Sequence, residues 1–584
     1  MNMIKTIGGQ VKEYWKASVA TPLFMLVEVA METIIPLLMA SIVNNGIEAG
    51  NSAHIYKVGV WMIVAALVSL LGGSMGAKMG AKASMGLGKN LRQEMFEHIQ
   101  TFSFANIDHF STAGLVTRLT TDVTNIQNAY QMILRMAMRS PATIICCMVM
   151  SFMISPKLAC IYLIATIFLG TVLILISMKA MKYFDQAFDK YDELNQSVQE
   201  NVSAIRVVKA YNRGDYEKKR FEKAADNIYK VFCQAESIVV MNNPVMQFTV
   251  YTCIILISWL GAHMVVGGSL QTGDLMALLT YCMNILMNLM MLSMIFVMIT
   301  MSMASMRRIS EVLNEESSLT NPENPVMEVA DGSIRFENVS FRYSATAETP
   351  ILDNISLEIK SGETIGIMGG TGSSKTSFVN MISRLYDVNE GAVYVGGKDV
   401  RSYDLDVLRN QVSVVLQQNV LFSGSIYDNL RWGDANASDE ECQAACRLAC
   451  ADEFIERFPE GYNTHIEQGG TNVSGGQKQR LCIARALLKK PKVLILDDST
   501  SAVDTATDAK IRKAFAQAIP GTTKLIISQR VSSVQDADRI IILDDGRLSG
   551  FGTHEELLES NAIYRDIYEA QTKGGGDFDE GGAN

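Results

Sequence analysis

The amino-acid sequence predicts a multidomain membrane protein, with an all-α transmembrane domain of six helices followed by an α/β nucleotide-binding domain of the P-loop type. Three observations support this prediction. The 584 residues are too many for one hydrophobic core, so we expect at least two domains. Long apolar stretches occur in the N-terminal part of the chain. A glycine-rich phosphate-binding motif and its usual partners follow in the C-terminal part.

Composition argues against a nucleic-acid-binding protein and against a disulfide-stabilised one. The net charge of −10 at pH 7 is the wrong sign for a nucleic-acid-binding protein, because phosphate recognition requires a basic surface. The ten cysteines are scattered, which is not the pattern of a disulfide framework. Cys442, Cys446 and Cys450 share one helical face, but no second cluster or nearby histidine completes a metal site. We interpret them as buried apolar residues.

A helix that spans a bilayer needs roughly 20 mostly apolar residues, and six stretches are candidates for such spans. Four of them contain no Asp, Glu, Lys or Arg: Val58–Ala77, Leu158–Met178, Ser237–Gly273 and Leu275–Met306. Ser140–Pro156 is also uncharged and extends backwards through Asn125–Met138. The first stretch, Thr21–Asn45, is interrupted by Glu28 and Glu32.

Basic residues between these stretches predict the orientation. Lys78–Arg139 holds seven Lys and Arg, and Lys179–Glu236 holds eleven, whereas the other connections hold almost none. Positive connections stay on the cytoplasmic side, so we expect both termini and both long segments there. Both segments have helical periodicity and few Gly or Pro, which predicts rods that extend beyond the membrane. Their tips are expected near Phe104–Gly114 and Tyr211–Tyr216.

These features divide the chain into five parts. We expect a cytoplasmic N-terminal segment at 1–20, a transmembrane domain at 21–308, a linker at 309–332, a nucleotide-binding domain at 333–571 and a disordered acidic tail at 572–584. The absence of a targeting segment favours the plasma (inner) membrane of a bacterium.

Two groups of residues in the transmembrane domain are candidates for a substrate cavity. Glu28 and Glu32 share one helical face, where they either line a water-accessible cavity or lie at the headgroups or against a neighbouring helix. The last span is rich in methionine, whose flexible side chain suits varied apolar ligands but also fills ordinary cores. The methionines taken as cavity candidates are Met287, Met291, Met294 and Met298.

The phosphate-binding motif lies between a strand-like ETIGIMG and a helical SFVNMISRLY. Its residues are Gly369, Gly370, Thr371, Gly372, Ser373, Ser374, Lys375 and Thr376, with Ser377 next. Backbone N–H groups approach the phosphates of ATP, Lys375 neutralises their charge, and Thr376 binds Mg²⁺. Ser374 stands where G-x-x-x-x-G-K-[ST] has its second glycine.

Two further motifs follow in the expected order. The apolar run Val493–Leu496 ends in Asp497 and Asp498, as in strands that deliver a carboxylate to Mg²⁺. Between the two motifs lies a sequence similar to the LSGGQ signature of ATP-binding-cassette (ABC) proteins. Its residues here are Ser474, Gly475, Gly476 and Gln477.

With these motifs, nearly the whole chain resembles a half-transporter of the ABC exporter family, of the multidrug type. The resemblance implies that Tyr343 stacks on adenine, that Gln417 contacts Mg²⁺, and that Ser501 and Asp504 communicate across a dimer. It also implies a head-to-tail pair of cassettes, in which each ATP lies between one phosphate loop and the partner's signature. ATP and Mg²⁺ are the expected cofactors.

The hydrolytic residues depart from the family pattern. The usual Glu after the Mg²⁺ aspartate is Asp498, whose shorter side chain misplaces the carboxylate by about 1 Å, enough to cost about 100-fold in rate. The usual His is Gln529, which cannot carry a positive charge. The signature is intact. We therefore expect a slow, degenerate ATP site of this chain's own, and a signature that completes the competent site of a non-identical partner.

The predicted function is ATP-driven export of drugs or other amphipathic organic molecules by alternating access. Besides the partner half-transporter, the expected partners are membrane lipid and a small amphipathic substrate. The alternatives are a lipid flippase, a bile-acid or peptide exporter, a homodimeric exporter with two slow sites, and an ATP-gated regulator or channel subunit.

Overall fold

The computed structural model describes residues 2–344, 349–499 and 501–574. Residues 575–584, which make up most of the predicted disordered tail, lie outside these ranges. The chain forms two compact units. The first contains Met1–Thr101 and Ser111–Glu315, and the second contains Phe102–Phe110 and Glu316–Asn584. Each unit is described in turn.

The first unit is helical, and six of its stretches are long and apolar enough to cross a membrane among the residues that the structure describes. The six stretches are Lys12–Ile47, Ser52–Gln100, Thr112–Ile154, Pro156–Phe184, Gly214–Val266 and Thr272–Asn314. The prediction of six apolar helices is therefore confirmed. The helices themselves are α1 (Asn2–Gly9), α2 (Trp15–Ser41), α3 (Ser52–Gln100), α5 (Thr112–Thr117), α6 (Val123–Met132), α7 (Met138–Ile154), α8 (Pro156–Ser203), α9 (Ile205–Ala210), α10 (Gly214–Val239), α11 (Asn242–Val266) and α12 (Thr272–Asn314).

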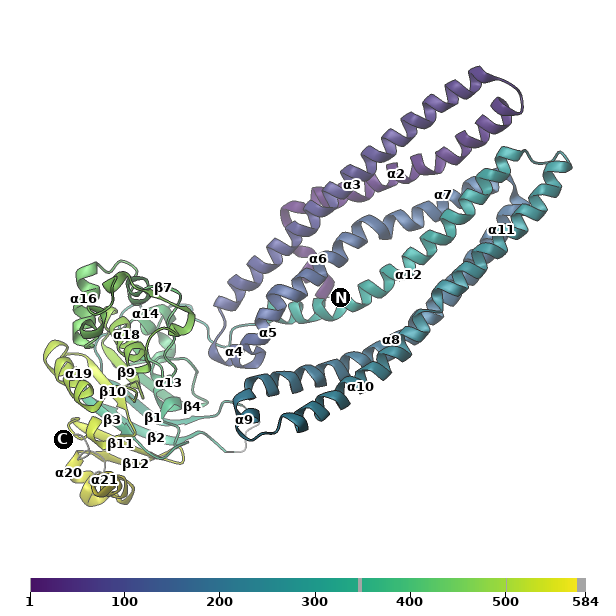
Figure 1. Cartoon of the computed structure of the whole chain (residues 1–584). Helices are drawn as coiled ribbons and strands as arrows, with labels where there is room; N and C mark the ends of the chain where they lie inside the picture. Colours follow the sequence, from purple (N-terminus) through teal and green to yellow (C-terminus); the bar gives the residue numbers. More distant parts are fainter. Residues whose placement is uncertain (1, 345–348, 500, 575–584) are drawn as a thin grey trace. The chain divides into compact units, whose positions relative to one another are not determined.

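Helices α3 and α8 are too long to lie within a bilayer. They contain 49 and 48 residues, or roughly 70 Å of helix at 1.5 Å per residue, against a hydrocarbon core of roughly 30 Å. Asn51 caps the start of α3 by accepting a hydrogen bond from the backbone of His54, and Pro156 opens α8. Helix α10 runs along α8 in Figure 1, so the two form a paired rod.

Small residues allow α2 and α3 to pack closely along their length (Figure 1). A methyl group added to Gly72 would lie 3.2 Å from the backbone nitrogen of Glu28. One added to Gly76 would lie 2.4 Å from the Met25 side chain. Close contact through glycine is a usual way for helices to associate in a membrane, where burial of apolar area provides no driving force.

The second unit is built on two main sheets. A parallel sheet, ordered β12-β11-β3-β10-β9-β6, has only β12 antiparallel to its neighbour, and a smaller antiparallel sheet is ordered β2-β1-β4-β5. The strands are β1 (Ile334–Phe341), β2 (Leu352–Ile359), β3 (Thr364–Met368), β4 (Glu390–Val395), β5 (Lys398–Asp399), β6 (Val412–Val415), β9 (Val493–Asp497), β10 (Thr523–Ile527), β11 (Arg539–Asp544) and β12 (Arg547–Gly552). β7 (Gly424–Ser425) and β8 (His465–Ile466) form a separate pair.

The central strands β3, β9 and β10 are apolar and almost wholly buried, as strands of a covered parallel sheet should be. The helices of this unit are α13 (Lys375–Ile382), α14 (Leu405–Gln411), α15 (Ile426–Leu430), α16 (Asp439–Leu448), α17 (Asp452–Ile455), α18 (Gly475–Leu488), α19 (Thr505–Ala518), α20 (His554–Ser560) and α21 (Ala562–Gly574). The carboxyl ends of parallel strands meet at one edge, which is where such folds bind ligands. The predicted α/β nucleotide-binding domain is therefore confirmed as a fold.

Candidate ATP-binding site and signature loop

The phosphate loop connects β3 to α13. Gly369 has φ 153°, and a methyl group there would lie 2.1 Å from the carbonyl oxygen of Leu543, so only glycine fits. Lys375 Nζ donates to the carbonyl oxygens of Gly369 at 3.0 Å and Gly370 at 2.7 Å, and to Ser373 Oγ at 3.1 Å. The ammonium group therefore lies over the loop whose N–H groups would face a phosphate. Burial lowers the pKa of Lys375.

Ser374 holds a left-handed backbone conformation, with φ 70° and ψ 22°, immediately before α13. This conformation costs a residue with a Cβ atom roughly 1–2 kcal/mol. Its side chain makes no capping hydrogen bond to the helix that could offset this cost. The missing glycine of the motif is therefore a point of backbone strain in the phosphate loop.

Ser374→Gly should relieve this strain. We expect the free energy of unfolding to rise by about 1 kcal/mol, after the greater flexibility of glycine in the unfolded chain is subtracted. ATP affinity should rise or stay level. Thermal unfolding with and without Mg-ATP measures both. Ser373→Gly, in the same loop at a residue without positive φ, is the control and should not stabilise the protein.

A polar wall faces the phosphate loop. Thr376 Oγ1 donates to Asp497 Oδ2 at 2.8 Å, which joins the start of α13 to the end of β9. Burial raises the pKa of Asp497, while the hydrogen bond from Thr376 opposes that rise. A hydroxyl and a carboxylate are hard oxygen donors of the kind that Mg²⁺ prefers, so this pair fits the ion.

A cavity of about 390 Å³ brings most of the predicted ATP-site residues together. It is lined by Tyr343, Ile351, Thr371, Gly372, Ser373, Ser374, Lys375, Thr376, Ser377, Gln417, Asp497, Asp498, Ile527 and Gln529. Gly369 and Gly370 form the loop beneath Lys375. Residues from several separate segments of the chain thus share one cavity.

The two departures from the hydrolytic pattern lie on this same cavity. Asp498 follows β9, has φ 46°, and donates its backbone N–H to the carbonyl oxygen of Ile527 at 3.1 Å. Burial raises its pKa, while the positive charges of Arg530 and Lys375 oppose that rise. Gln529 follows β10 and is exposed. Neither strand end offers a Glu or a His at these positions.

The signature residues begin α18. Ser474 Oγ accepts from the backbone of Gln477 at 3.3 Å, and the Gln477 side chain accepts from the Ser474 backbone at 2.9 Å, which forms a capping box. A methyl group on Gly475 would lie 3.4 Å from the Ala502 side chain, an ordinary contact. One on Gly476 would lie 2.7 Å from the Ala502 carbonyl oxygen, which is too close.

The segment with Ser501 and Asp504 links this signature to the ATP cavity. Ser501 Oγ donates to the carbonyl oxygen of Asp498 at 2.9 Å, and Asp504 caps α19 by accepting from the backbone of Thr507 at 2.9 Å. That bond lowers the pKa of Asp504. Ser501 and Asp504 are exposed.

Three residues that the sequence analysis missed hold these loops in place. Gln479 bonds Ser501 Oγ and the backbone N–H of Ala502, and its place two residues after Gln477 was the available signal. Arg530 donates to the carbonyl oxygens of Ser501 and Val503. Gln571 of α21 bonds the backbone of Gln529 at 2.7 Å and of Val531 at 2.9 Å. No local pattern predicts this last contact, because α21 is distant in sequence.

The predicted cavity residues of the transmembrane unit occupy two separate helices. Glu28 and Glu32 lie on α2, where both pair with Arg139 of α7: Arg139 Nη2 lies 2.9 Å from Glu32 Oε1 and 3.5 Å from Glu28 Oε1. This is the pairing with a neighbouring helix that the sequence left open. The candidate methionines lie on α12, where Met287, Met291 and Met294 are exposed and Met298 is half-buried.

Removing this cation should leave Glu28 and Glu32 without their ion-pair partner among apolar helices. We expect Arg139→Met to lower the free energy of unfolding by about 2 kcal/mol, less than for a fully buried pair because the groups are partly exposed. Adding Glu28→Gln and Glu32→Gln should restore most of the loss. Thermal unfolding in lipid nanodiscs tests this, and no recovery in the triple variant would contradict it.

Comparisons with known proteins agree with this geometry. Residues 19–290 match the family described as the ABC transporter transmembrane region, and residues 352–501 match the ABC transporter family. The chain is 38% identical to YfiB of Bacillus subtilis, an uncharacterized ABC transporter ATP-binding protein, over 94% of this chain and 95% of that protein. An uncharacterized ABC transporter ATP-binding protein of Mycobacterium tuberculosis is 32% identical over 96% of this chain and 97% of that protein.

A solved structure shares the fold. It is described as a bacterial Atm1-family ABC exporter with ATP bound, and it superposes with a TM-score of 0.82 at 24% identity, over 96% of this chain and 98% of that chain. The six apolar spans and the bacterial relatives make this chain an integral protein of a bacterial inner membrane. The chain therefore belongs to the ABC transporter family, as a half-transporter with the exporter fold whose cassette couples ATP hydrolysis to transport.

Proposed function

We propose that this half-transporter pairs with a non-identical partner, holds one ATP at a slow site and supplies its signature to the partner's fast site. The observation that carries this proposal is the placement of Asp498 and Gln529 on the wall of the ATP cavity. Both positions need a particular side chain for rapid hydrolysis, and both lack it. The signature, in contrast, keeps its capping box and its glycines.

The chain's own site is suited to binding. Lys375 would face the phosphates, the bonded pair Thr376 and Asp497 would hold Mg²⁺, and Gln417 and Tyr343, which line the same cavity, would contact the ion and stack on adenine. The bound cation supplies charge neutralisation on the phosphates. Hydrolysis needs a base that orients the attacking water. The Asp498 carboxylate is one methylene short of the usual reach, and the Gln529 amide cannot donate a proton as an imidazolium does.

The signature contributes to the partner's ATP site and not to the chain's own. The N-terminus of α18 carries free backbone N–H groups and the positive end of the helix dipole, which together bind anions. In a head-to-tail pair this end faces the partner's ATP, while Ser501 and Asp504 lie at the same interface. Closure of the cassettes then drives the alternating access of the transmembrane domains.

The ATPase activity of this chain alone, compared with that of the chain paired with a partner half-transporter, tests the proposal. The chain purified alone should hydrolyse ATP slowly, and co-expression with a non-identical half-transporter that carries Glu and His at the positions of Asp498 and Gln529 should raise the rate by an order of magnitude or more. Size-exclusion chromatography should show a mixed dimer. Full exporter rates from the isolated chain, abolished by Asp498→Asn, would show a homodimer instead.

We further propose export of drugs or other amphipathic molecules, with both termini in the cytoplasm. The exposed Met287, Met291 and Met294 of α12 support an adaptable apolar surface. Inside-out vesicles containing the complex should accumulate a cationic amphipathic dye when given ATP. Movement of a labelled phospholipid without dye uptake would favour a lipid flippase.

A further inference from the structure

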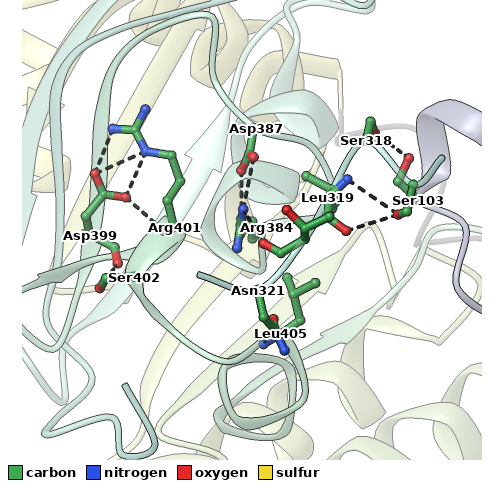
Figure 2. A network of polar contacts seen from close by, with 12 residues as sticks. Ser103, Ser318, Leu319, Asn321, Arg384, Asp387, Asp399, Arg401, Ser402 and Leu405 are labelled. Carbon is green, nitrogen blue, oxygen red and sulfur yellow. Dashed lines mark hydrogen bonds and ion pairs between the residues drawn. The ribbon is translucent and has the colours of Figure 1, made fainter. Parts of the chain in front are cut away.

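The segment Phe102–Phe110, which joins α3 to α5 and contains α4 (Phe104–Phe110), is grouped with the nucleotide-binding unit. One set of its contacts is with the start of the linker. Ser103 Oγ lies 2.7 Å from Ser318 Oγ, as Figure 2 shows. Asn106 donates to the carbonyl oxygen of Glu316 at 3.1 Å and accepts from the backbone of Ser318 at 3.1 Å. None of these linker groups lines the ATP cavity, so this anchor makes no direct contact with the nucleotide site.

The linker is itself fixed to the same unit. Asn321 donates to Asp404 Oδ2 at 2.6 Å, and its side-chain oxygen accepts from the backbone of Leu405 at 3.0 Å. Arg384, which is buried, pairs with Asp387 at 2.8 Å and donates to the Thr320 carbonyl oxygen at 3.3 Å. The part of Phe102–Phe110 that contacts the linker is therefore held to the nucleotide-binding unit.

A second set of contacts leads toward the ATP cavity through Tyr386. Its hydroxyl donates to Asp108 Oδ2 at 2.8 Å, and its ring lies 6.1 Å from that of Phe104. On the other side, its ring meets Tyr343 edge-on, with centroids 5.1 Å apart and planes at 86°. Burial and the bond to Asp108 raise the pKa of Tyr386, so the hydroxyl stays protonated and remains the donor.

Tyr343 is the residue in this series of contacts that is expected to meet the nucleotide. It lines the ATP cavity, is half exposed, and its hydroxyl lies 2.9 Å from Ser377 Oγ just after the phosphate motif. A purine stacked on the Tyr343 ring fixes its orientation. Aromatic pairs prefer an edge-to-face or offset arrangement, and the Tyr343–Tyr386 pair has the edge-to-face one, so a fixed Tyr343 favours the present position of Tyr386. The Tyr386 hydroxyl then holds a charge-assisted bond to Asp108.

We propose that Tyr386 is a positioning residue that transmits occupation of the adenine side of the cavity, through Tyr343, to the segment Phe102–Phe110. The segment thus responds to the base of the nucleotide and not to its phosphates alone. This inference rests on the proposed adenine-binding role of Tyr343. It does not depend on which site of the transporter hydrolyses ATP.

Hydrogen exchange of the full-length chain in nanodiscs tests the proposal. With Mg-ATP, amides in 102–110 should exchange about tenfold more slowly, the size expected for one hydrogen bond to a charged group. Magnesium tripolyphosphate, which lacks a base, should protect the phosphate loop but leave 102–110 unchanged. Tyr386→Phe should lose the ATP response at 102–110 while its ATP dissociation constant stays within about twofold of wild type.

Three variants complete the design. Tyr394→Phe is the matched control, because Tyr394 is also half-buried with its hydroxyl bonded to a carboxylate, that of Glu337, and it should respond as wild type. Asp108→Ala should reproduce Tyr386→Phe, and the double variant should lose no more than either. Tyr343→Ala should weaken ATP binding as well as remove the response.

Two outcomes would overturn the proposal. One is that amide exchange in 102–110 slows equally with ATP and with tripolyphosphate, or slows with neither. The other is a wild-type response in Tyr386→Phe. A fast ATPase of the isolated chain would refute the slow-site proposal without changing these exchange results, so the two failures are distinguishable.

Discussion

Gly475→Ala is expected to lower the ATPase rate of the co-expressed complex by about 100-fold, the usual loss when a preorganised N–H donor is displaced from a reacting phosphate or oxyanion. The chain itself should fold normally, because the added methyl group meets only the Ala502 side chain at 3.4 Å and the backbone is not left-handed. The loss therefore reports on the partner's ATP. Steady-state ATPase rates and thermal unfolding together measure it.

Gly370→Ala is the matched control for this experiment. It makes the same substitution in the chain's own phosphate loop, where no atom lies within 4 Å of the added methyl group. In a mixed pair it should affect only the slow site, so the complex should keep most of its ATPase activity. In a homodimer every ATP lies between this loop and this signature, so comparable losses from both substitutions would refute the mixed pair.

Restoring the hydrolytic residues should give the opposite result. Asp498→Glu together with Gln529→His is expected to raise the hydrolysis rate of the isolated chain by about 100-fold, because the longer carboxylate reaches the water and the imidazole can carry charge. Each single substitution should give less than the pair. Single-turnover ATP hydrolysis is the appropriate measurement, since it does not depend on product release.

The backbone conformation of Asp498 determines which control variant this experiment needs. Asp498 has φ 46°, a conformation that Asp tolerates better than Glu, so the double variant should unfold at a slightly lower temperature. Asp498→Gln with Gln529→His has the same length and the same strain but no carboxylate, and it should remain slow. An equal gain in that variant would show that the length of the side chain at position 498, and not its negative charge, limits the hydrolysis rate.

Much of this protein could be predicted from local patterns. Uncharged runs such as Leu158–Met178 require a bilayer or a core wherever they fold, and their number predicts the spans that the structure contains. The phosphate motif around Lys375 lies in a strand–loop–helix whose conformation is fixed within a few residues. Most of the predicted ATP-site residues lie in recognisable motifs, and the structure places most of them on one cavity.

Other features depend on contacts between distant parts of the chain. No sequence pattern joins Gln571 to Gln529, or Arg139 to Glu28 and Glu32, because these pairs form only when separate helices and loops pack together. Tyr386 gave no signal for the same reason. Its sequence neighbours do not reveal that Tyr343 and Asp108 lie on either side of it.

The sequence by itself determined the two parts of this transporter and the chemistry of its ATP site, because apolar length, loop glycines and ionisable side chains act locally. Only the tertiary structure decided how those residues are held. The strand ends bring Thr376 to Asp497, and the fold places Asp498 and Gln529 on one cavity. It also grouped Phe102–Phe110 with the cassette, because packing and hydrogen bonds, not adjacency along the chain, define a structural unit.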